Sequence, residues 1–156
     1  MAREIERKFL LANADWRQAA TGSRPFRQGY LAVENGLTVR VRLIGADRAR
    51  LTLKAGKTGL VRDEFEYDIP RADGEALLLL SGGHVIEKVR YDVPVGASPW
   101  TIDVFSGRHS GLVMAEIELD AEDAPFERPS WLGREVTDDP RYANANLAHA
   151  AKPPVI

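Results

Sequence analysis

Charged residues of both signs occupy alternate positions in most of the strand-like segments of this chain. Side chains two residues apart on a β-strand point to the same side. Several strands of one sheet would therefore bring carboxylates and cations onto one common face, which could bind metal ions and a polyanion. The pattern occurs in five segments: Glu4, Glu6 and Lys8; Arg40 and Arg42; Arg62, Glu64 and Glu66; Lys88 and Arg90; Glu116 and Glu118.

The order of the segments predicts a mainly β protein with about eight strands and a few helices. Asn35-Gly36 is a strong hairpin signal, and most other connections are short. Short connections imply antiparallel pairing, and strands spaced this evenly favour a closed barrel or a sandwich. Strands are expected at residues 3–11, 28–34, 37–44, 49–55, 60–69, 85–93, 100–105 and 112–120; helices at about 13–20, 73–80 and 141–150; a turn at 56–59; and a loop at 133–140.

The opposite face of the strands decides how the charged face is interpreted. On any single strand, alternating charges more often mark the solvated side of an antiparallel sheet. Here the opposite face is apolar, as at Val39, Val41 and Leu43, and helices at 76–80 and at the C-terminus could cover it from outside. A barrel with a charged lumen and helices packed outside accounts for both faces. The lumen must be wet, because unpaired ions buried in a dry interior are costly.

Composition and charge exclude several classes of function. The length of 156 residues suits one domain, expected over residues 1–156. The formal net charge is only −2, so no diffuse attraction to nucleic acid or an acidic membrane is expected. The absence of cysteine excludes disulfides and thiolate metal sites. A charged N-terminus and short apolar runs predict a cytoplasmic protein without a signal peptide or membrane span.

At its charged positions the chain resembles the CYTH superfamily of triphosphate tunnel metalloenzymes, and in particular the bacterial branch. The opening E-x-E-x-K motif at residues 4–8 is the hallmark of that family. Further matches follow in order along nearly the whole chain: R-x-R at 40–42, LTLK at 51–54, R-x-E-x-E at 62–66, K-x-R at 88–90, IDVF at 102–105, E-x-E at 116–118 and GREVTDDPRYANANLA at 133–148. The resemblance implies an eight-stranded antiparallel barrel that forms a tunnel, Mg²⁺- or Mn²⁺-dependent activity on triphosphates, and a possible homodimer.

The resemblance also implies roles for the charged residues. Carboxylate oxygens suit Mg²⁺, and arginine and lysine suit phosphate oxygens. Lys88 is also a candidate proton donor or leaving-group stabiliser, and Tyr30 matches a family position near the substrate, although an ordinary strand aromatic is an equal interpretation. The implied metal ligands are Glu4, Glu6, Glu64, Asp103, Glu116 and Glu118, with Glu66 a further tunnel acid. The implied phosphate clamp is Lys8, Arg40, Arg42, Lys54, Arg62, Lys88 and Arg90. The alternative for the whole set is a lattice of cross-strand ion pairs.

The function that we predict is metal-assisted hydrolysis of inorganic tripolyphosphate to pyrophosphate and phosphate. A cationic clamp would hold the triphosphate extended while a metal-bound or acid-held water attacks a terminal phosphorus in line. No feature for recognising a base or ring is visible in the sequence. Three alternatives stay open: the same fold acting on thiamine triphosphate or nucleoside triphosphates or as an adenylate cyclase, a non-catalytic polyphosphate-binding module, and a lipocalin-like barrel for an apolar ligand.

Overall fold

Tight turns lay consecutive strands side by side. At the tip of the first hairpin, Asn35 and Gly36 have φ values of 50° and 78°, the left-handed conformation that a two-residue hairpin turn of type I′ requires. The computed structural model describes residues 2–56, 60–150 and 152–154, so most of the turn predicted at 56–59 lies outside the described residues. None of the helices in this described part has the length and apolar character needed to cross a bilayer.

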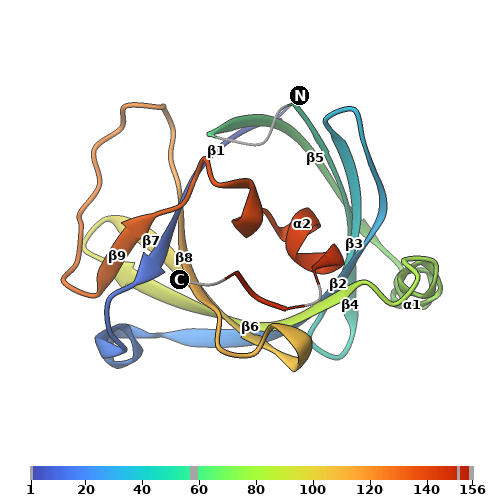
Figure 1. The fold of residues 1–156 in the computed structure, drawn as a ribbon, viewed down its shortest axis with the longest axis horizontal. Coiled ribbons are helices and arrows are strands. Elements are labelled where there is room, and N and C mark those ends of the chain that lie inside the picture. The colour runs from blue at the N-terminus through green and yellow to red at the C-terminus, as the bar shows by residue number, and fades with distance from the viewer. Residues whose placement is uncertain (1, 57–59, 151, 155–156) are drawn as a thin grey trace.

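The strands close into the predicted eight-stranded antiparallel barrel. Around the ring they follow the order β5-β4-β3-β2-β6-β7-β8-β1, and β1 also pairs with β5 (Figure 1). The pairing brings distant positions together: across β1 and β8, Glu6 lies opposite Glu118 and Lys8 opposite Glu116. The strands are β1 Ala2–Leu11, β2 Gly22–Glu34, β3 Leu37–Ile44, β4 Arg48–Ala55, β5 Val61–Ile69, β6 Val85–Val95, β7 Ser98–Ser106 and β8 Val113–Glu118.

A ninth strand, β9 (Leu132–Glu135), lies where the sequence predicted a loop, so that prediction is wrong at residues 133–135. On one edge of β1, β5 pairs only with residues 2–5. The backbone groups further along the same edge also need partners, and β9 pairs with them at Phe9 and Leu11. Gly133 permits the close approach, because a Cβ there would lie 2.8 Å from the Leu10 carbonyl oxygen. Arg7 fastens the pair through two hydrogen bonds to the Glu135 carboxylate, of 2.6 and 2.8 Å.

Two groups of side chains cover the outer face of the barrel. Helix α1 (Arg71–Leu79) packs Leu78 against Val41, Leu43 and Ala49 of β3 and β4, which confirms one helix on the outside. On the other side, the predicted helix at 13–20 is a short 3₁₀ turn, η1 (Asp15–Ala19). Trp16 of η1 joins a buried aromatic and aliphatic cluster with residues from β1, β6, β7, β8 and the segment before β9: Phe9, Val93, Trp100, Ile102, Ala115, Ile117 and Trp131.

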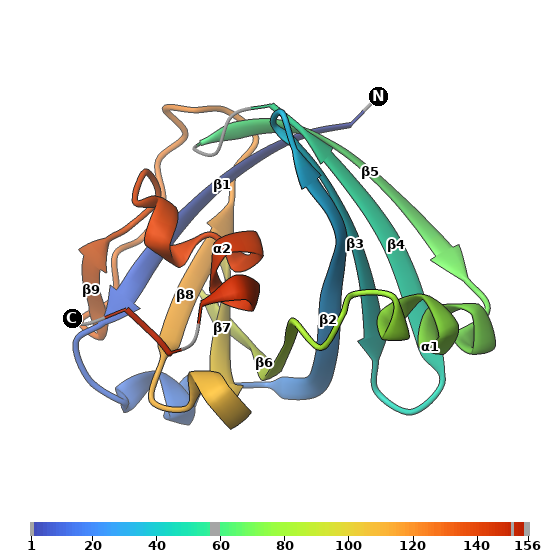
Figure 2. The ribbon, with the colours of Figure 1, turned by 45° about the vertical axis from the view of Figure 1, so that its right-hand side comes forward.

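The C-terminal helix was expected outside the barrel, and that expectation is wrong. A 3₁₀ turn, η3 (Pro140–Tyr142), and helix α2 (Asn144–His149) lie within the ring of strands (Figures 1 and 2). The reason is that part of the inward face is apolar. Tyr142, Leu147 and Ala148 pack against inward side chains of five strands and the residue before β8, namely Leu10, Tyr30, Ile86, Phe105, Leu112 and Met114.

Candidate active site

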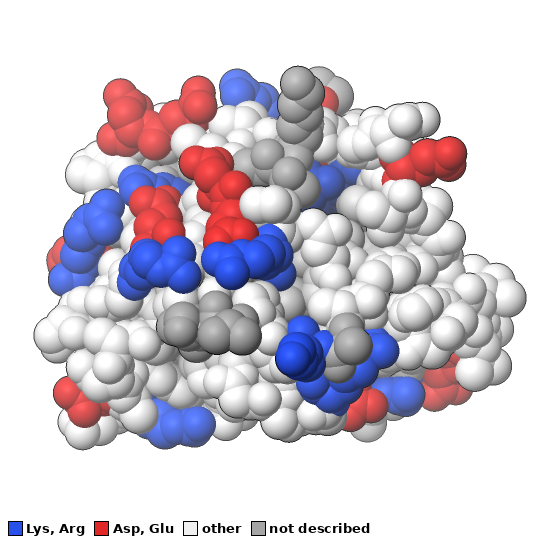
Figure 3. All heavy atoms as spheres, in the orientation of Figure 1, with Lys and Arg blue, Asp and Glu red and all other residues white. Residues whose placement is uncertain are grey.

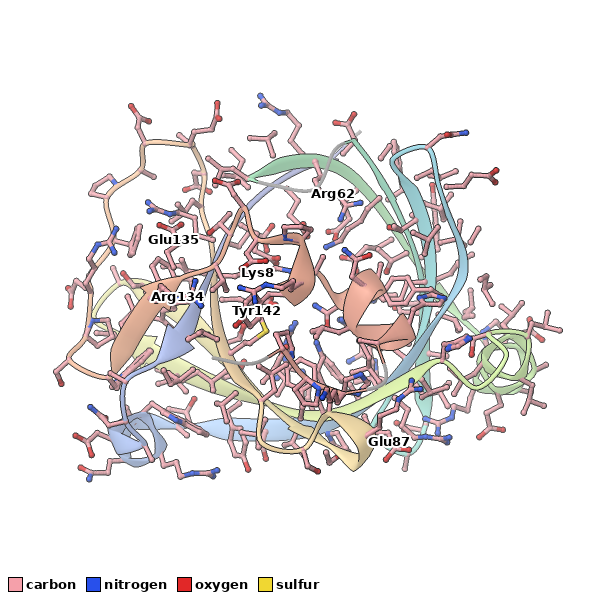
Figure 4. All side chains as sticks on the ribbon, in the orientation of Figure 1. Lys8, Arg62, Glu87, Arg134, Glu135 and Tyr142 are labelled. Carbon is pink, nitrogen blue, oxygen red and sulfur yellow. The ribbon has the colours of Figure 1, made fainter. Side chains whose placement is uncertain are left out.

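The rest of the barrel interior is a cavity of about 710 Å³ lined by charged side chains. Lys8 of β1 and Arg62 of β5 point into the ring, whereas Glu87 of β6 lies outside it (Figure 4). Alternation along the strands explains the difference, because Glu87 is next to the inward Lys88. All but two of the predicted site residues line the cavity: Glu4, Glu6, Lys8, Tyr30, Arg40, Arg42, Lys54, Arg62, Glu64, Glu66, Arg90, Glu116 and Glu118.

The acids of the cavity are crowded. Burial and a hydrogen bond to Glu4 raise the pKa of Glu64 to about 8. Burial, with repulsion from Glu4 and Glu6, also raises the pKa of Glu118. Although burial opposes it, the attraction of Lys54 holds the pKa of Glu4 below its ordinary value. Carboxylates that retain protons because negative charge has accumulated around them favour a bound cation.

Several of these acids are engaged with the cations of the cavity. Lys54 Nζ lies 2.9 Å from Glu4 Oε1 and 3.4 Å from Glu64 Oε2, and Lys8 Nζ lies 3.6 Å from Glu6 Oε1. Ion pairs therefore connect some of these acids and cations, and they line an open cavity. Within the described residues, no three acidic or histidine side chains already converge as a metal site would require. The donor set nevertheless fits a hard divalent cation, because carboxylate oxygens from β1, β5 and β8 face one space.

Arg42 is a buried cation whose hydrogen-bond partner is neutral. Its guanidinium donates to Gln28 Oε1 at 2.7 Å and lies over the Phe26 ring, 4.3 Å from the centroid. No described carboxylate lies within ion-pair distance of it, and its side chain is 6% exposed. Burial, with repulsion from Arg40 and Arg90, lowers the pKa of Arg42 well below its ordinary value. A buried positive charge held by neutral groups will attract an anion strongly.

Lys88 and Asp103 are the two predicted residues that do not line the cavity. Both lie just behind its wall, where Lys88 Nζ donates to Asp103 Oδ2 at 2.7 Å and Arg90 makes bonds of 2.7 and 2.8 Å to the two carboxylate oxygens. Burial lowers the pKa of Lys88 to about 7, Arg90 and Arg42 add to the effect, and Asp103 opposes it. The pKa of Asp103 is lowered because both cations outweigh its burial. Asp103 is therefore placed to orient the clamp and not to face a metal ion in the cavity.

Tyr30 belongs to both of its predicted environments. It is 8% exposed, it packs in the interior apolar cluster, and it also lines the cavity. The two interpretations of this residue are therefore compatible.

Sequence reasoning missed the neutral polar residues of the site. Thr52 accepts from Arg40 at 3.1 Å and donates to Glu66 at 3.2 Å, and Gln28 and Asn144 hold Arg42 and Lys88. The strand pattern could have identified two of them, because Gln28 is two residues from Tyr30 and Thr52 two residues from Lys54, on the inward faces of their strands. No pattern pointed to Asn144, because the C-terminal helix was expected outside the barrel.

Comparison with known proteins gives a consistent result. The family model described as the CYTH domain matches residues 2–149. The chain is 44% identical over 148 residues to an inorganic triphosphatase of Acetivibrio thermocellus, with 94% of each protein covered. It is 39% identical over 150 residues to an inorganic triphosphatase of Nitrosomonas europaea, with 93% of this chain and 96% of the relative covered.

Solved structures share the barrel. The crystal structure of the inorganic triphosphatase NE1496 matches with a TM-score of 0.66 at 36% identity, over 94% of this chain and 98% of that one. The protein HpAC1 from Hippeastrum, a putative adenylyl cyclase described as having a dominant triphosphatase activity, matches with a TM-score of 0.57 at 16% identity, over 76% and 80% of the two chains. That second likeness shows the fold alone.

Proposed function

The chain belongs to the CYTH domain family, and we propose that it is a phosphoanhydride hydrolase that cleaves inorganic triphosphate to pyrophosphate and phosphate. The observation that supports the proposal is the cavity inside the barrel, which is lined by a dense set of cations and by crowded acids. The two curated relatives, each matched over nearly its whole length, are inorganic triphosphatases.

Binding begins with two cations, Arg42 and Arg62, that make no ion pair with any described carboxylate. Arg42 is held by Gln28, and Arg62 makes one long hydrogen bond, of 3.5 Å, to Thr38. Their charges are free for phosphate oxygens, to which the planar guanidinium is well suited. On the face shown in Figure 3, acidic and basic groups lie near one another, and the net charge of the chain is −2, so no strong general attraction for an anion is expected there. We assign the remaining clamp positions to Lys8, Arg40, Lys54 and Arg90.

A divalent cation, Mg²⁺ or Mn²⁺, is the cofactor that the cavity acids would hold. When bound, it would neutralise phosphate charge and make a water more acidic. The proposed ligands are carboxylates that face the cavity from β1, β5 and β8: Glu4, Glu6, Glu64, Glu116 and Glu118. Glu66, which lies 3.9 Å from Arg40 and 3.8 Å from Arg50, orients cations instead.

The chain's own groups supply orientation and a proton. Asp103 fixes Arg90 through two hydrogen bonds, so the guanidinium has a set direction towards the cavity. Phosphoryl transfer depends mainly on such positioning and on charge neutralisation. Lys88, whose pKa is lowered to about 7 by burial and which lies just behind the cavity wall, is the proposed proton donor to the phosphate that leaves. Tyr30 forms part of the wall beside these groups.

The decisive experiment compares phosphate release from tripolyphosphate, ATP and thiamine triphosphate at equal concentrations. Tripolyphosphate should be cleaved fastest, and the nucleotide products should contain no cyclic AMP. Faster cleavage of an organic triphosphate would replace the proposed substrate, and binding without cleavage would indicate a polyphosphate-binding module.

The variant Glu116→Ala tests the acids. Turnover should be lost while the barrel stays folded, because a proposed metal ligand is removed. The matched control is Glu87→Ala on the outer face, where Glu87 makes only an exposed pair with Arg27 at 3.6 Å. Chelation with EDTA should stop the wild-type reaction, and Mg²⁺ or Mn²⁺ should restore it; undiminished activity in Glu116→Ala, or indifference to chelator, would count against the assignment. The single domain, cytoplasmic location and possible homodimer stay predictions.

A further inference from the structure

Two amides, the buried Gln28 and the half-buried Asn144, connect the phosphate clamp to helix α2. Arg42 Nε donates to Gln28 Oε1 at 2.7 Å, and the Gln28 amide nitrogen donates to Asn144 Oδ1 at a longer 3.5 Å. Lys88 Nζ donates to the same Asn144 oxygen at 3.2 Å. Gln28 and Lys88 are 0% and 1% exposed and Asn144 is half-buried, so water has at most limited access to these bonds. Asn144 thus lies between two cations that are far apart in sequence.

Chemistry fixes which way each amide faces. The ammonium of Lys88 and the guanidinium of Arg42 are donors only, so each must face an amide oxygen and not an amide nitrogen. With its oxygen towards Lys88 and Gln28, Asn144 turns its amide nitrogen the other way. Asn144 lines the cavity, and its amide nitrogen makes no hydrogen bond to a described residue. The side chain therefore offers an N–H donor that no described residue uses.

The helix that carries Asn144 is held firmly in the barrel. Leu147 and Ala148 are fully buried in the interior apolar cluster. The carbonyl oxygen of Leu147 lies 2.6 Å from His109 Nε2, and that of Ala148 accepts from Arg108 at 2.8 Å. Both partners come from η2 (Gly107–His109), which follows β7. The position of the Asn144 side chain is set by this packing before any substrate arrives.

We propose that Asn144 is a substrate-binding residue that also positions Lys88. Its oxygen accepts from Lys88, and its amide nitrogen donates to a phosphate oxygen of the bound triphosphate. The inference rests on the proposed function. A neutral amide suits this place, because a carboxylate would pair with Lys88 and would repel the phosphate.

The test is the near-isosteric variant Asn144→Asp. It keeps an oxygen for Lys88 and is well tolerated in the first turn of a helix. A merely structural role of Asn144 would therefore leave the thermal midpoint and KM for tripolyphosphate unchanged, whereas the new ion pair with Lys88 can alter kcat under either role. The proposal predicts an unchanged thermal midpoint, with KM for tripolyphosphate raised by about tenfold or more, since a hydrogen bond to a charged group is replaced by repulsion. Binding of tripolyphosphate measured by calorimetry without metal should weaken by a similar factor.

The matched control is Asn146→Asp, which adds the same charge two residues further along α2. The Asn146 amide already donates to the Pro140 carbonyl oxygen at 2.7 Å, so its effect on KM should be several-fold smaller. Asn144→Ala, which removes both hydrogen bonds, should lower kcat and raise KM together. Wild-type kinetics in Asn144→Asp, or equal losses in both Asp variants, would overturn the role of Asn144 alone. A wild-type protein that neither binds nor cleaves tripolyphosphate would overturn the proposed function as well.

Discussion

At the scale of single residues, Asp103 is the acid on which two cations depend. Its side chain is 1% exposed, and its carboxylate accepts hydrogen bonds from Lys88 Nζ and from Nε and Nη2 of Arg90. Removing one partner of a buried ion pair leaves charge uncompensated where water cannot solvate it. The stability of this part of the wall and the direction of the clamp therefore depend on the same carboxylate.

Asp103→Asn should lower the free energy of unfolding by about 3–5 kcal/mol, because the buried Lys88 loses its counter-charge and the partly buried Arg90 retains only Glu116, 3.3 Å away, as a described acidic partner. Urea unfolding monitored by tryptophan fluorescence measures this. The control is Asp92→Asn, since Asp92 makes a half-exposed pair with Arg24 at 2.9 Å and should change stability by less than about 1 kcal/mol. Equal effects in the two variants would show that Asp103 is not a structural counter-ion.

The raised pKa of Glu64 predicts how the free energy of unfolding depends on pH. Its pKa is raised from 4.5 to about 8 in the folded protein, so the folded state binds this proton more tightly than the unfolded state. The stabilisation is complete below pH 4.5 and is lost as the pH rises through about 8. In EDTA, the free energy of unfolding should therefore fall over this range, and Glu64→Gln should show a smaller fall. Identical pH profiles for the two proteins would contradict the assignment.

The inward direction of the charged residues was predictable from alternation, and their partners were not. The K-x-R and IDVF segments put Lys88, Arg90 and Asp103 on inward faces, as the structure confirms. That Arg90 lies opposite Asp103 depends on the register of β6 and β7, which the local sequence does not determine. The metal role that the resemblance implies for Asp103 stays a prediction, and its hydrogen bonds to Lys88 and Arg90 could not be predicted.

At the scale of elements, α1 shows how closely a helix can approach the barrel. Gly74 lies in the middle of α1 and is buried against β4. A Cβ at this position would lie 2.5 Å from Ala49 Cβ and 3.0 Å from Leu43 Cδ2. Packing and not helix propensity therefore determines this residue.

Gly74→Ala should destabilise the protein by about 1–3 kcal/mol despite the better helix propensity of alanine, since the overlap must push α1 away from the sheet. Catalytic activity at a temperature well below the transition should be retained, because α1 lies outside the barrel and the cavity inside. Glu75→Ala, on the exposed side of the same helix, is the control for thermal denaturation. A more stable Gly74→Ala protein would mean that the contact can relax.

Strands and helices were predictable where the hydrophobic pattern or the turn residues specified them, as in the hairpin at Asn35-Gly36. Strand β9 and the position of helix α2 were not predictable in this way. β9 has four residues and exists because an edge of β1 needs a partner, which is a property of the assembled sheet. The place of α2 depends on Tyr142 and Leu147 finding an apolar part of the barrel interior, and the charged motifs of the strands gave no sign of it.

At the scale of the whole molecule, the cavity should link ligand binding to stability. A ligand that binds only the folded barrel stabilises it by about 2.7 kcal/mol at roughly 100 times its Kd. Tripolyphosphate should therefore raise the thermal midpoint, more so with Mg²⁺, and sulfate at equal ionic strength should not. Arg42→Gln should reduce the shift, whereas Arg27→Gln on the outer face should preserve it. A shift that survives in Arg42→Gln would place binding elsewhere.

The pairing of β1 has a consequence for the order in which the protein assembles during synthesis. This strand is the first to leave the ribosome, yet its neighbours in the ring are β5, β8 and β9, which follow much later in the chain. Contacts of such long sequence separation form slowly, and incomplete sheets expose edges. The nascent chain must therefore keep β1 without a partner until β5 has emerged, and only partly paired until residue 135 has emerged, with Glu4, Glu6 and Lys8 exposed to water in the interval. Their charges suit this interval, because a charged strand resists aggregation with other chains while it waits.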